Sequence, residues 1–174
     1  MIFAVVGPSG VGKDTLIAGA AAARPDLHVV RRVITRPTEA GGEDFEGVTP
    51  SAFAVRKAAG EFAVDWSAHG LRYGIPHSQV DRPGDLVFNC SRAALTAAQA
   101  AFCDLRVILV TAPSASLAER LAARGREDIA DIRARLARAD FQLPNGIQAT
   151  TIINDSTAEQ GIARLPAALQ PVRA

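Results

Sequence analysis

A stretch near the start of the chain combines glycines and a lysine at the spacing of a loop that binds phosphate groups. It lies between an apolar run at Ile2–Val6 and an alanine-rich run at Lys13–Ala23. Glycines let backbone N–H groups turn toward an anion, the start of a helix adds partial positive charge, and the lysine reaches the outer phosphates. A glycine-rich turn without a ligand would not need that lysine, so we expect a nucleoside triphosphate to bind here. The residues are Gly7, Pro8, Ser9, Gly10, Val11, Gly12, Lys13, Asp14 and Thr15.

Asp14 departs from the usual form of this loop. A serine or threonine that ligates magnesium commonly stands there, and Thr15 comes one residue later. The Asp14 carboxylate and the Thr15 hydroxyl are therefore candidate ligands of Mg²⁺, directly or through water. Alternatively, Asp14 only favours the first turn of the helix, where acidic side chains suit the helix dipole. Both interpretations stay open.

Polar side chains also gather at the end of a second apolar run, Leu86–Cys90. Asn89, Ser91 and Arg92 fall at its end, where ligands collect in open α/β sheets. Asn89 and Ser91 suit hydrogen bonds to sugar hydroxyls, although both types also form turns at strand ends. Most arginines in a chain with 19 basic residues are solvated. That is the simplest interpretation of Arg31, Arg32, Arg133 and Arg138.

The surrounding pattern predicts a parallel sheet with helices on both faces. Further apolar runs at Leu105–Val110 and Thr151–Ile153 read as buried strands. Helical stretches alternate with the strands, which is typical of α/β proteins. They are expected near Ala93–Ala101, Leu117–Ala123 and Ala158–Leu169.

Two segments interrupt this alternation. Between about residues 31 and 80, Thr49 begins a helix that Gly60 ends, and two short runs, Phe62–Trp66 and Leu71–Ile75, flank a turn at His69. We interpret Phe62 and Trp66 as packing residues of this inserted lobe and His69 as a solvated residue. The arginine-rich stretch 120–138 predicts a mobile helical cover.

Composition limits the class of protein. The 174 residues suit one domain, and a net charge of +1 leaves no general attraction to nucleic acid or membranes. Cys90 and Cys103 are expected to be buried in a reducing compartment. With no basic leader and no apolar run near ~20 residues, we expect a cytoplasmic protein.

The chain resembles guanylate kinases over nearly its full length. The matching features, besides the glycine loop, are Thr35-Arg36-Pro37, Asp44, Gly60-Glu61-Phe62, Tyr73-Gly74, residues 120–125, Ile132, Arg135-Leu136 and Ile153-Asn154-Asp155. This resemblance implies an α/β fold of the P-loop NTPase type. It is a three-layer sandwich with a mainly parallel five-stranded sheet, a small acceptor-binding lobe at 31–80 and a helical lid at 120–138.

The same resemblance implies roles on the ATP side. Residues 1–30, 81–119 and 139–174 would form a core that binds ATP with Mg²⁺. Arg124 and Asn154 would lie near the adenine, and Arg120 and Arg135 on the phosphates. With Lys13, the three arginines would be the catalytic cations.

The acceptor side departs from guanylate kinases at three positions. That family's second arginine after Thr-Thr-Arg falls on Glu39, its phosphate-binding tyrosine on Phe45, and its guanine-reading glutamate on Val64. Valine accepts no hydrogen bond, and an unpaired polar group in a closed pocket costs ~1 to 3 kcal/mol. The sequence therefore argues against GMP as the acceptor.

The remaining motifs resemble the ribose 1,5-bisphosphate phosphokinases of phosphonate catabolism. They are Gly10 to Thr15, Gly41-Gly42-Glu43-Asp44, His69 to Pro76 and Asn89 to Arg92. This resemblance implies transfer of the ATP γ-phosphoryl group to the 1-phosphate of a sugar bisphosphate, ribose 1,5-bisphosphate, giving 5-phosphoribosyl 1-diphosphate. The expected acceptor-binding residues are Arg36, Asp44, Arg72, Tyr73, Asn89, Ser91 and Arg92. The alternatives are a nucleoside monophosphate kinase with altered base choice and a non-catalytic binding module, which the intact Lys13 argues against.

Overall fold

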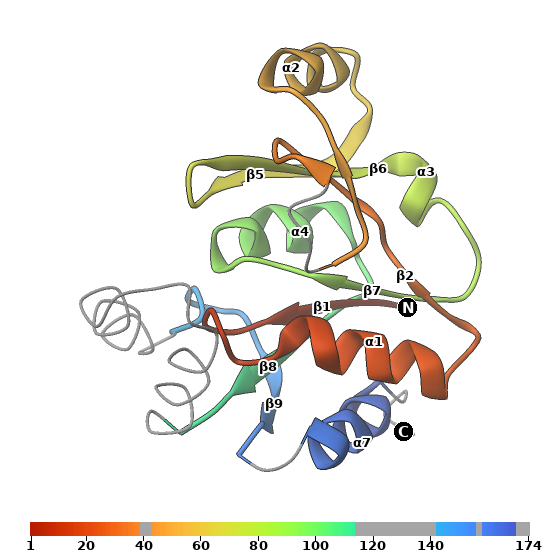
Figure 1. The fold of residues 1–174 in the computed structure, drawn as a ribbon, viewed down its shortest axis with the longest axis vertical. Helices are drawn as coiled ribbons and strands as arrows, with labels where there is room; N and C mark the ends of the chain where they lie inside the picture. Colours follow the sequence, from red (N-terminus) through yellow and green to blue (C-terminus); the bar gives the residue numbers. More distant parts are fainter. Residues whose placement is uncertain (39–42, 114–141, 156–157, 170–174) are drawn as a thin grey trace.

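The computed structural model describes residues 1–38, 43–113, 142–155 and 158–169. Its central sheet has five strands, all parallel, in the order β2-β7-β1-β8-β9. This confirms the predicted five-stranded α/β sheet (Figure 1). The strands are β2 (Leu27–Val29), β7 (Asp85–Asn89), β1 (Ile2–Val6), β8 (Leu105–Thr111) and β9 (Ala149–Ile153).

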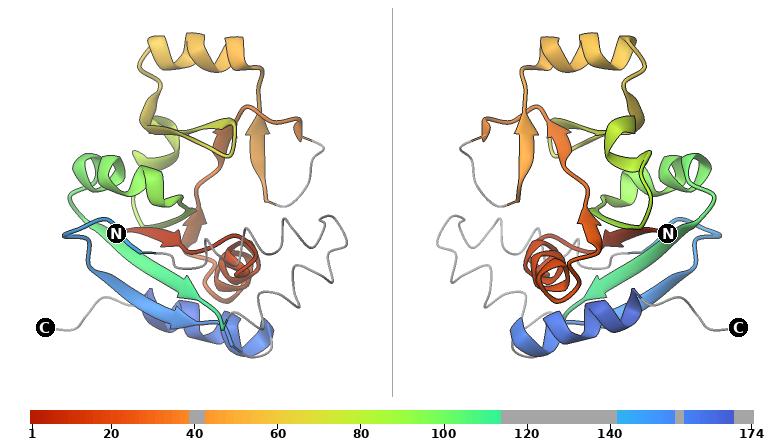
Figure 2. Two further views of the ribbon diagram at one scale, coloured as in Figure 1. Left: turned by 90° about the vertical axis from the view of Figure 1, so that its left-hand side faces the viewer. Right: turned by 90° about the vertical axis from the view of Figure 1, so that its right-hand side faces the viewer.

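Alternate residues of β1 pack against opposite layers of helices. Phe3 and Val5 lie in a buried cluster with side chains of α1 (Lys13–Ala23) and α7 (Ala158–Ala168). Ala4 and Val6 lie in a second cluster with α4 (Leu95–Ala101), which a short 3₁₀ turn, η2 (Arg92–Ala94), precedes. Because side chains of a strand alternate between faces, the sheet is covered on both sides, giving the expected three layers (Figures 1 and 2).

A second, four-stranded sheet lies above the α4 face of the central sheet (Figure 1). We call it the small sheet; its strand order is β4-β3-β6-β5, and all its strands fall within the predicted insert. Side chains of β5 and β6, including Val64 and Ile75, share the second buried cluster with Phe88 and Leu95 of the core. The strands are β3 (Arg32–Ile34), β4 (Phe45–Gly47), β5 (Phe62–Ala68) and β6 (Leu71–Pro76).

Local sequence explains the elements around the small sheet. The Thr49 side chain accepts a hydrogen bond from the Ala52 N–H at 3.2 Å and caps α2 (Pro50–Ala58), as the sequence predicted. The β5–β6 hairpin turns at His69 and Gly70, which both have positive φ. The short helix α3 (His77–Val80) then leads back to the central sheet.

Three further expectations concern the cysteines, the predicted lid and membrane-spanning helices. Cys90 is buried, but Cys103 is exposed, so the prediction that both cysteines are buried is wrong for Cys103. Leu117–Ala123, the stretch 120–138 and Glu39 lie outside the described residues. Within the described part of the chain, no helix is long and apolar enough to cross a membrane.

Candidate active site

The glycine loop joins the end of β1 to the start of α1 in a backbone form that other residues fit poorly. A Cβ atom on Gly7 would lie 2.2 Å from the Val110 carbonyl oxygen. Gly12 has φ +93°, and a Cβ there would lie 2.9 Å from Asn154 Nδ2. Since this φ disfavours residues with a side chain, the glycines allow the loop to turn tightly in front of α1.

Lys13 folds back along this loop. Its ammonium group donates to the carbonyl oxygens of Gly7 at 2.9 Å and Pro8 at 3.1 Å. Burial lowers the pKa of Lys13 to about 8, and the nearby Arg32 guanidinium acts in the same direction, while Asp14 and Glu43 oppose the shift. A cation that burial destabilises gains by pairing with an anion, which suits a phosphate ligand.

Asn89 connects the helix after the loop to the end of β7. Its Nδ2 donates to Asp14 Oδ1 at 2.6 Å. The Asp14 and Thr15 side chains are both exposed beside Lys13. Two hard oxygen donors therefore stand next to Lys13.

A cavity of about 790 Å³ extends from the glycine loop to the small sheet. Its wall combines the loop, the end of β7, the residues that follow β7, and the inner side of the small sheet. It is lined by Gly7, Pro8, Ser9, Gly10, Gly12, Lys13, Asp14, Thr15, Arg32, Arg36, Glu43, Trp66, Ser67, Ala68, His69, Leu71, Tyr73, Asn89, Cys90, Ser91, Arg92 and Ala93.

Arg32 ties the small sheet to the central sheet inside this wall. Only 5% of the residue is exposed. Its guanidinium pairs with both carboxylate oxygens of Glu43 and donates to the Asn89 carbonyl oxygen at 2.7 Å. The guanidinium carbon also lies 5.4 Å from the ring centroid of Tyr73, which stacks on Trp66. The interpretation of Arg32 as a solvated surface residue is therefore wrong, because ion pairing and aromatic contacts hold it in the interior.

No protein-family model matches the sequence, but curated relatives do. Ribose 1,5-bisphosphate phosphokinase PhnN from Ruegeria sp. (strain TM1040) is 49% identical over 177 residues, which is 99% of this chain and 93% of the relative. The chain belongs to the ribose 1,5-bisphosphate phosphokinase family. The PhnN protein of Rhizobium etli is 47% identical over 95% of this chain and 87% of its own length.

Other members of the ribose 1,5-bisphosphate phosphokinase family carry this unit within a longer protein. The bifunctional ribose 1,5-bisphosphokinase-thymidine phosphorylase of Cupriavidus necator is 48% identical over 97% of this chain but only 29% of its own length. Solved structures establish the fold. A guanylate kinase from Anaplasma phagocytophilum has a TM-score of 0.66 at 17% identity, with 97% of this chain and 84% of that chain covered. A gluconokinase from Sinorhizobium meliloti has a TM-score of 0.55 at 14% identity, with 96% and 90% covered.

Most of the described residues that sequence reasoning assigned to ligands meet at the cavity of this family member. Two residues predicted to bind ATP, Val11 and Asn154, are buried and do not line the cavity. Val11 is buried in the core, and Asn154 donates from Nδ2 to the Val11 carbonyl oxygen at 2.8 Å. The predicted acceptor residues that line the cavity are Arg36, Tyr73, Asn89, Ser91 and Arg92. Arg120, Arg124 and Arg135 lie outside the described residues.

Two predicted acceptor residues do not line the cavity. Arg72 is exposed on β6, where its backbone N–H donates to the Thr35 hydroxyl. The side chain of Asp44 is 81% exposed and pairs with Arg31. Their roles stay predictions, and the carboxylate that the segment before β4 presents to the cavity belongs to the neighbouring Glu43.

Sequence reasoning missed several residues of the cavity wall. Trp66 packs in the apolar cluster and His69 is exposed, as the sequence predicted, but both also line the cavity. Their place in the wall was missed because the small sheet faces the glycine loop, which local sequence does not reveal. Two buried polar atoms of the wall, Trp66 Nε1 and Ser91 Oγ, have no hydrogen-bond partner among the described residues. Cys90 also lines it, and burial raises the pKa of this thiol to about 12, so it stays protonated. The apolar residues on both sides of the Arg31-Arg32 pair, at 29–30 and 33–34, were the one available signal for a buried arginine here.

The residues beside Lys13 fit a magnesium ion in the manner of P-loop kinases. No group of three or more histidine, cysteine, aspartate or glutamate side chains that could hold a metal occurs in the described ranges. Mg²⁺ in such enzymes needs only one or two protein oxygens, because substrate phosphates complete its shell. Asp14 Oδ2 and the Thr15 hydroxyl satisfy this donor requirement.

Proposed function

We propose that this protein transfers the γ-phosphoryl group of ATP to the 1-phosphate of ribose 1,5-bisphosphate, giving 5-phospho-α-D-ribose 1-diphosphate in phosphonate catabolism. The observation that carries the proposal is one cavity that joins the glycine loop to Arg36 and Arg92. The name of its PhnN relatives supports the same reaction. The proposal includes the cytoplasmic location expected from the sequence.

The proposed reaction needs cations and alignment more than a base. A phosphate monoester with a second pKa near ~6 is largely dianionic at neutral pH, so its oxygen can attack without losing a proton. The attacking oxygen forms a bond to the γ-phosphorus while the bond to the β-phosphate oxygen breaks, and ADP leaves. Catalysis of such transfers comes from fixed positive groups around the moving phosphoryl group.

On the ATP side, Lys13 and the loop N–H groups would hold the phosphates. Asp14 and Thr15 would hold Mg²⁺, which would neutralise charge on the β- and γ-phosphates. The predicted lid, residues 120–138, would bring Arg120, Arg124 and Arg135 over the reacting groups. The lid and its three arginines lie outside the residues that the structure describes, and their roles are part of the proposal.

On the acceptor side, residues 31–80 would grip the bisphosphate. Arg36 rests with its guanidinium carbon 4.3 Å from the ring centroid of Phe45, and Arg92 follows the end of β7. Planar guanidinium groups bind phosphate through two hydrogen bonds each. The unpartnered Ser91 Oγ and Trp66 Nε1 add donors for phosphate or sugar oxygens.

Val64 argues against a guanylate kinase. By the resemblance to guanylate kinases, it stands at the position of that family's guanine-reading glutamate, but it is 4% exposed and packs in the apolar cluster with Trp66 and Ile75. An apolar residue packed in this way offers guanine no hydrogen-bond acceptor.

A coupled assay tests the proposal directly. Purified protein is incubated with Mg²⁺ and ATP plus either ribose 1,5-bisphosphate or GMP, ADP is measured, and the product is identified by mass. We expect turnover with the bisphosphate alone. Lys13→Ala is the matched control, and it should lower turnover by roughly 10²- to 10³-fold, the typical effect of losing one preorganised group that stabilises transition-state charge. Turnover with GMP alone would instead make the protein a guanylate kinase.

A further inference from the structure

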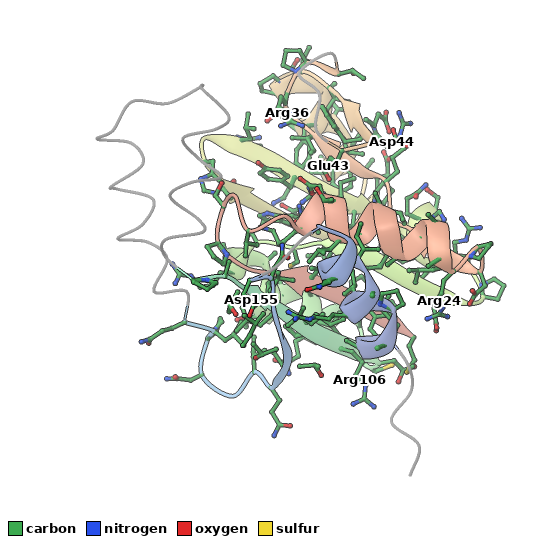
Figure 3. All side chains as sticks on the ribbon, turned by 60° about the horizontal axis from the view of Figure 1, so that its bottom comes forward. Arg24, Arg36, Glu43, Asp44, Arg106 and Asp155 are labelled. Carbon is green, nitrogen blue, oxygen red and sulfur yellow. The ribbon has the colours of Figure 1, made fainter. Side chains whose placement is uncertain are left out.

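Resting on the proposed function, we infer that Glu43 recognises the ribose hydroxyls of the acceptor and thereby sets its specificity for an intact ribose. Glu43 is the residue before the predicted Asp44, and it lines the cavity that Asp44 does not. Figure 3 shows Glu43 on the side of the small sheet nearer to α1, whereas Asp44 lies toward its outer edge.

The buried guanidinium of Arg32 holds the Glu43 carboxylate in place. The Glu43 side chain is 22% exposed, while Arg32 is almost fully buried and contacts both carboxylate oxygens. The Asn89 carbonyl oxygen and the Tyr73 ring hold the guanidinium in turn. A carboxylate held in this way keeps its orientation toward the cavity without a ligand having to order it.

The charge of the pair makes it compatible with a bisphosphate. A lone carboxylate beside two phosphates would repel them, but the Arg32 cation balances it. A carboxylate has about four lone-pair sites, so oxygens that accept from one guanidinium can still accept from other donors. The pair therefore offers the cavity hydrogen-bond acceptors with little net charge.

Among the acceptor's groups, only hydroxyls match such acceptors. Dianionic phosphates have no proton to donate, whereas the 2- and 3-hydroxyls of ribose do. Two carboxylates occur among the described lining residues, Asp14 and Glu43. Asp14 lies beside Lys13 and accepts from Asn89, which leaves Glu43 as the carboxylate on the side of the small sheet.

The test compares kcat/KM for ribose 1,5-bisphosphate with its 2-deoxy and 3-deoxy analogues. Because all three carry the same phosphates, their ratios report only the hydroxyl contacts. A hydrogen bond to a charged group is worth enough to predict that wild-type protein disfavours at least one analogue by on the order of 10- to 100-fold. In Glu43→Gln this discrimination should fall to a few-fold, whatever happens to the absolute rates.

Glu46→Gln is the matched control. Glu46 lies on β4 of the small sheet and pairs with Arg56 of α2 at 2.6 Å, but it does not line the cavity, so its substitution should leave the discrimination unchanged. A purely structural Glu43 would lower all three rates equally, and that result would overturn the inference. So would a loss of discrimination in Asp44→Asn with none in Glu43→Gln.

The wild-type measurement keeps the inference testable if Glu43→Gln fails to fold. Wild-type protein that uses ribose 1,5-bisphosphate and both analogues equally well reads no hydroxyl, and the inference fails while the proposed function stands. Wild-type protein that does not use ribose 1,5-bisphosphate refutes the proposed function itself.

Discussion

The two sides of the cavity are built in different ways. The proposed ATP side is made by consecutive residues, and its shape depends on backbone groups between Gly7 and Lys13. The proposed acceptor side is made by side chains from β3, from the segment before β4, from the β5–β6 hairpin and from the end of β7. A site made from one stretch of backbone can be recognised by a sequence motif, whereas a site assembled from side chains far apart in the sequence cannot.

The largest effect expected from this difference is on stability, at the Arg32–Glu43 pair. Arg32→Leu leaves the carboxylate of Glu43 without its buried partner, so we expect a loss of about 3 kcal/mol in the free energy of unfolding. Chemical denaturation measures it. The double variant Arg32→Leu/Glu43→Leu should recover much of this loss, because it leaves no unpaired charge behind.

Arg31→Leu is the control for that experiment. Arg31 is the neighbouring residue, but its pair with Asp44 is largely exposed, so its loss should change the free energy of unfolding by less than about 1 kcal/mol. Equal losses in Arg31→Leu and Arg32→Leu would mean that the acceptor side does not depend on its buried pair.

Removing one acceptor-side cation should separate the two substrates kinetically. In Arg92→Ala we expect KM for ribose 1,5-bisphosphate to rise by on the order of 10-fold or more, with KM for ATP nearly unchanged, since a hydrogen bond to a charged group is lost on one side only. Steady-state kinetics with each substrate varied in turn measures this. Arg106→Ala, at an exposed position near the start of β8 (Figure 3), should alter neither constant. Unchanged kinetics in Arg92→Ala would remove Arg92 from the site.

A smaller effect should come from the proton on Lys13. Because burial lowers the pKa of this ammonium to about 8, the ligand-free protein loses the charge as the pH rises through that value. ATP favours the protonated form, so its affinity should be constant below pH 8 and fall by up to about tenfold per pH unit above it. Calorimetric titration with ATP from pH 7 to pH 9.5 measures the profile.

Lys13→Arg serves as the reference for this profile, because arginine keeps its charge over the whole range. A profile as flat in the wild-type protein as in Lys13→Arg would show that Lys13 does not titrate near pH 8.

The sequence predicted the elements whose signals are local. α1 has the bounds expected from its composition, and Thr49 caps α2 as its position before Pro50 suggested. The strands β2, β3 and β4 were not predicted, because each has three residues and so shows no clear alternation. Tertiary pairing in the sheets, and not local propensity, holds such short strands.

The same limit applies to the candidate site: residues with a local sequence signal were predicted, and residues placed by tertiary packing were not. The sequence identified the loop residues. It could not show which of Glu43 and Asp44 lines the cavity, because that depends on the orientation of the segment before β4. Arg32 was misjudged because burial of an arginine depends on a partner 11 residues away and on the aromatic pair of a distant hairpin.

The hydrogen bonds of Lys13 to its own loop have a consequence for the thermodynamics of nucleotide binding. A lysine side chain carries up to ~2 kcal/mol of rotamer freedom, which is lost when the chain is fixed. Two of its three N–H groups are already engaged with Gly7 and Pro8, so folding has confined the side chain and left a third donor for a phosphate. The entropy of ordering this lysine therefore belongs to the free energy of folding and not to that of ATP binding.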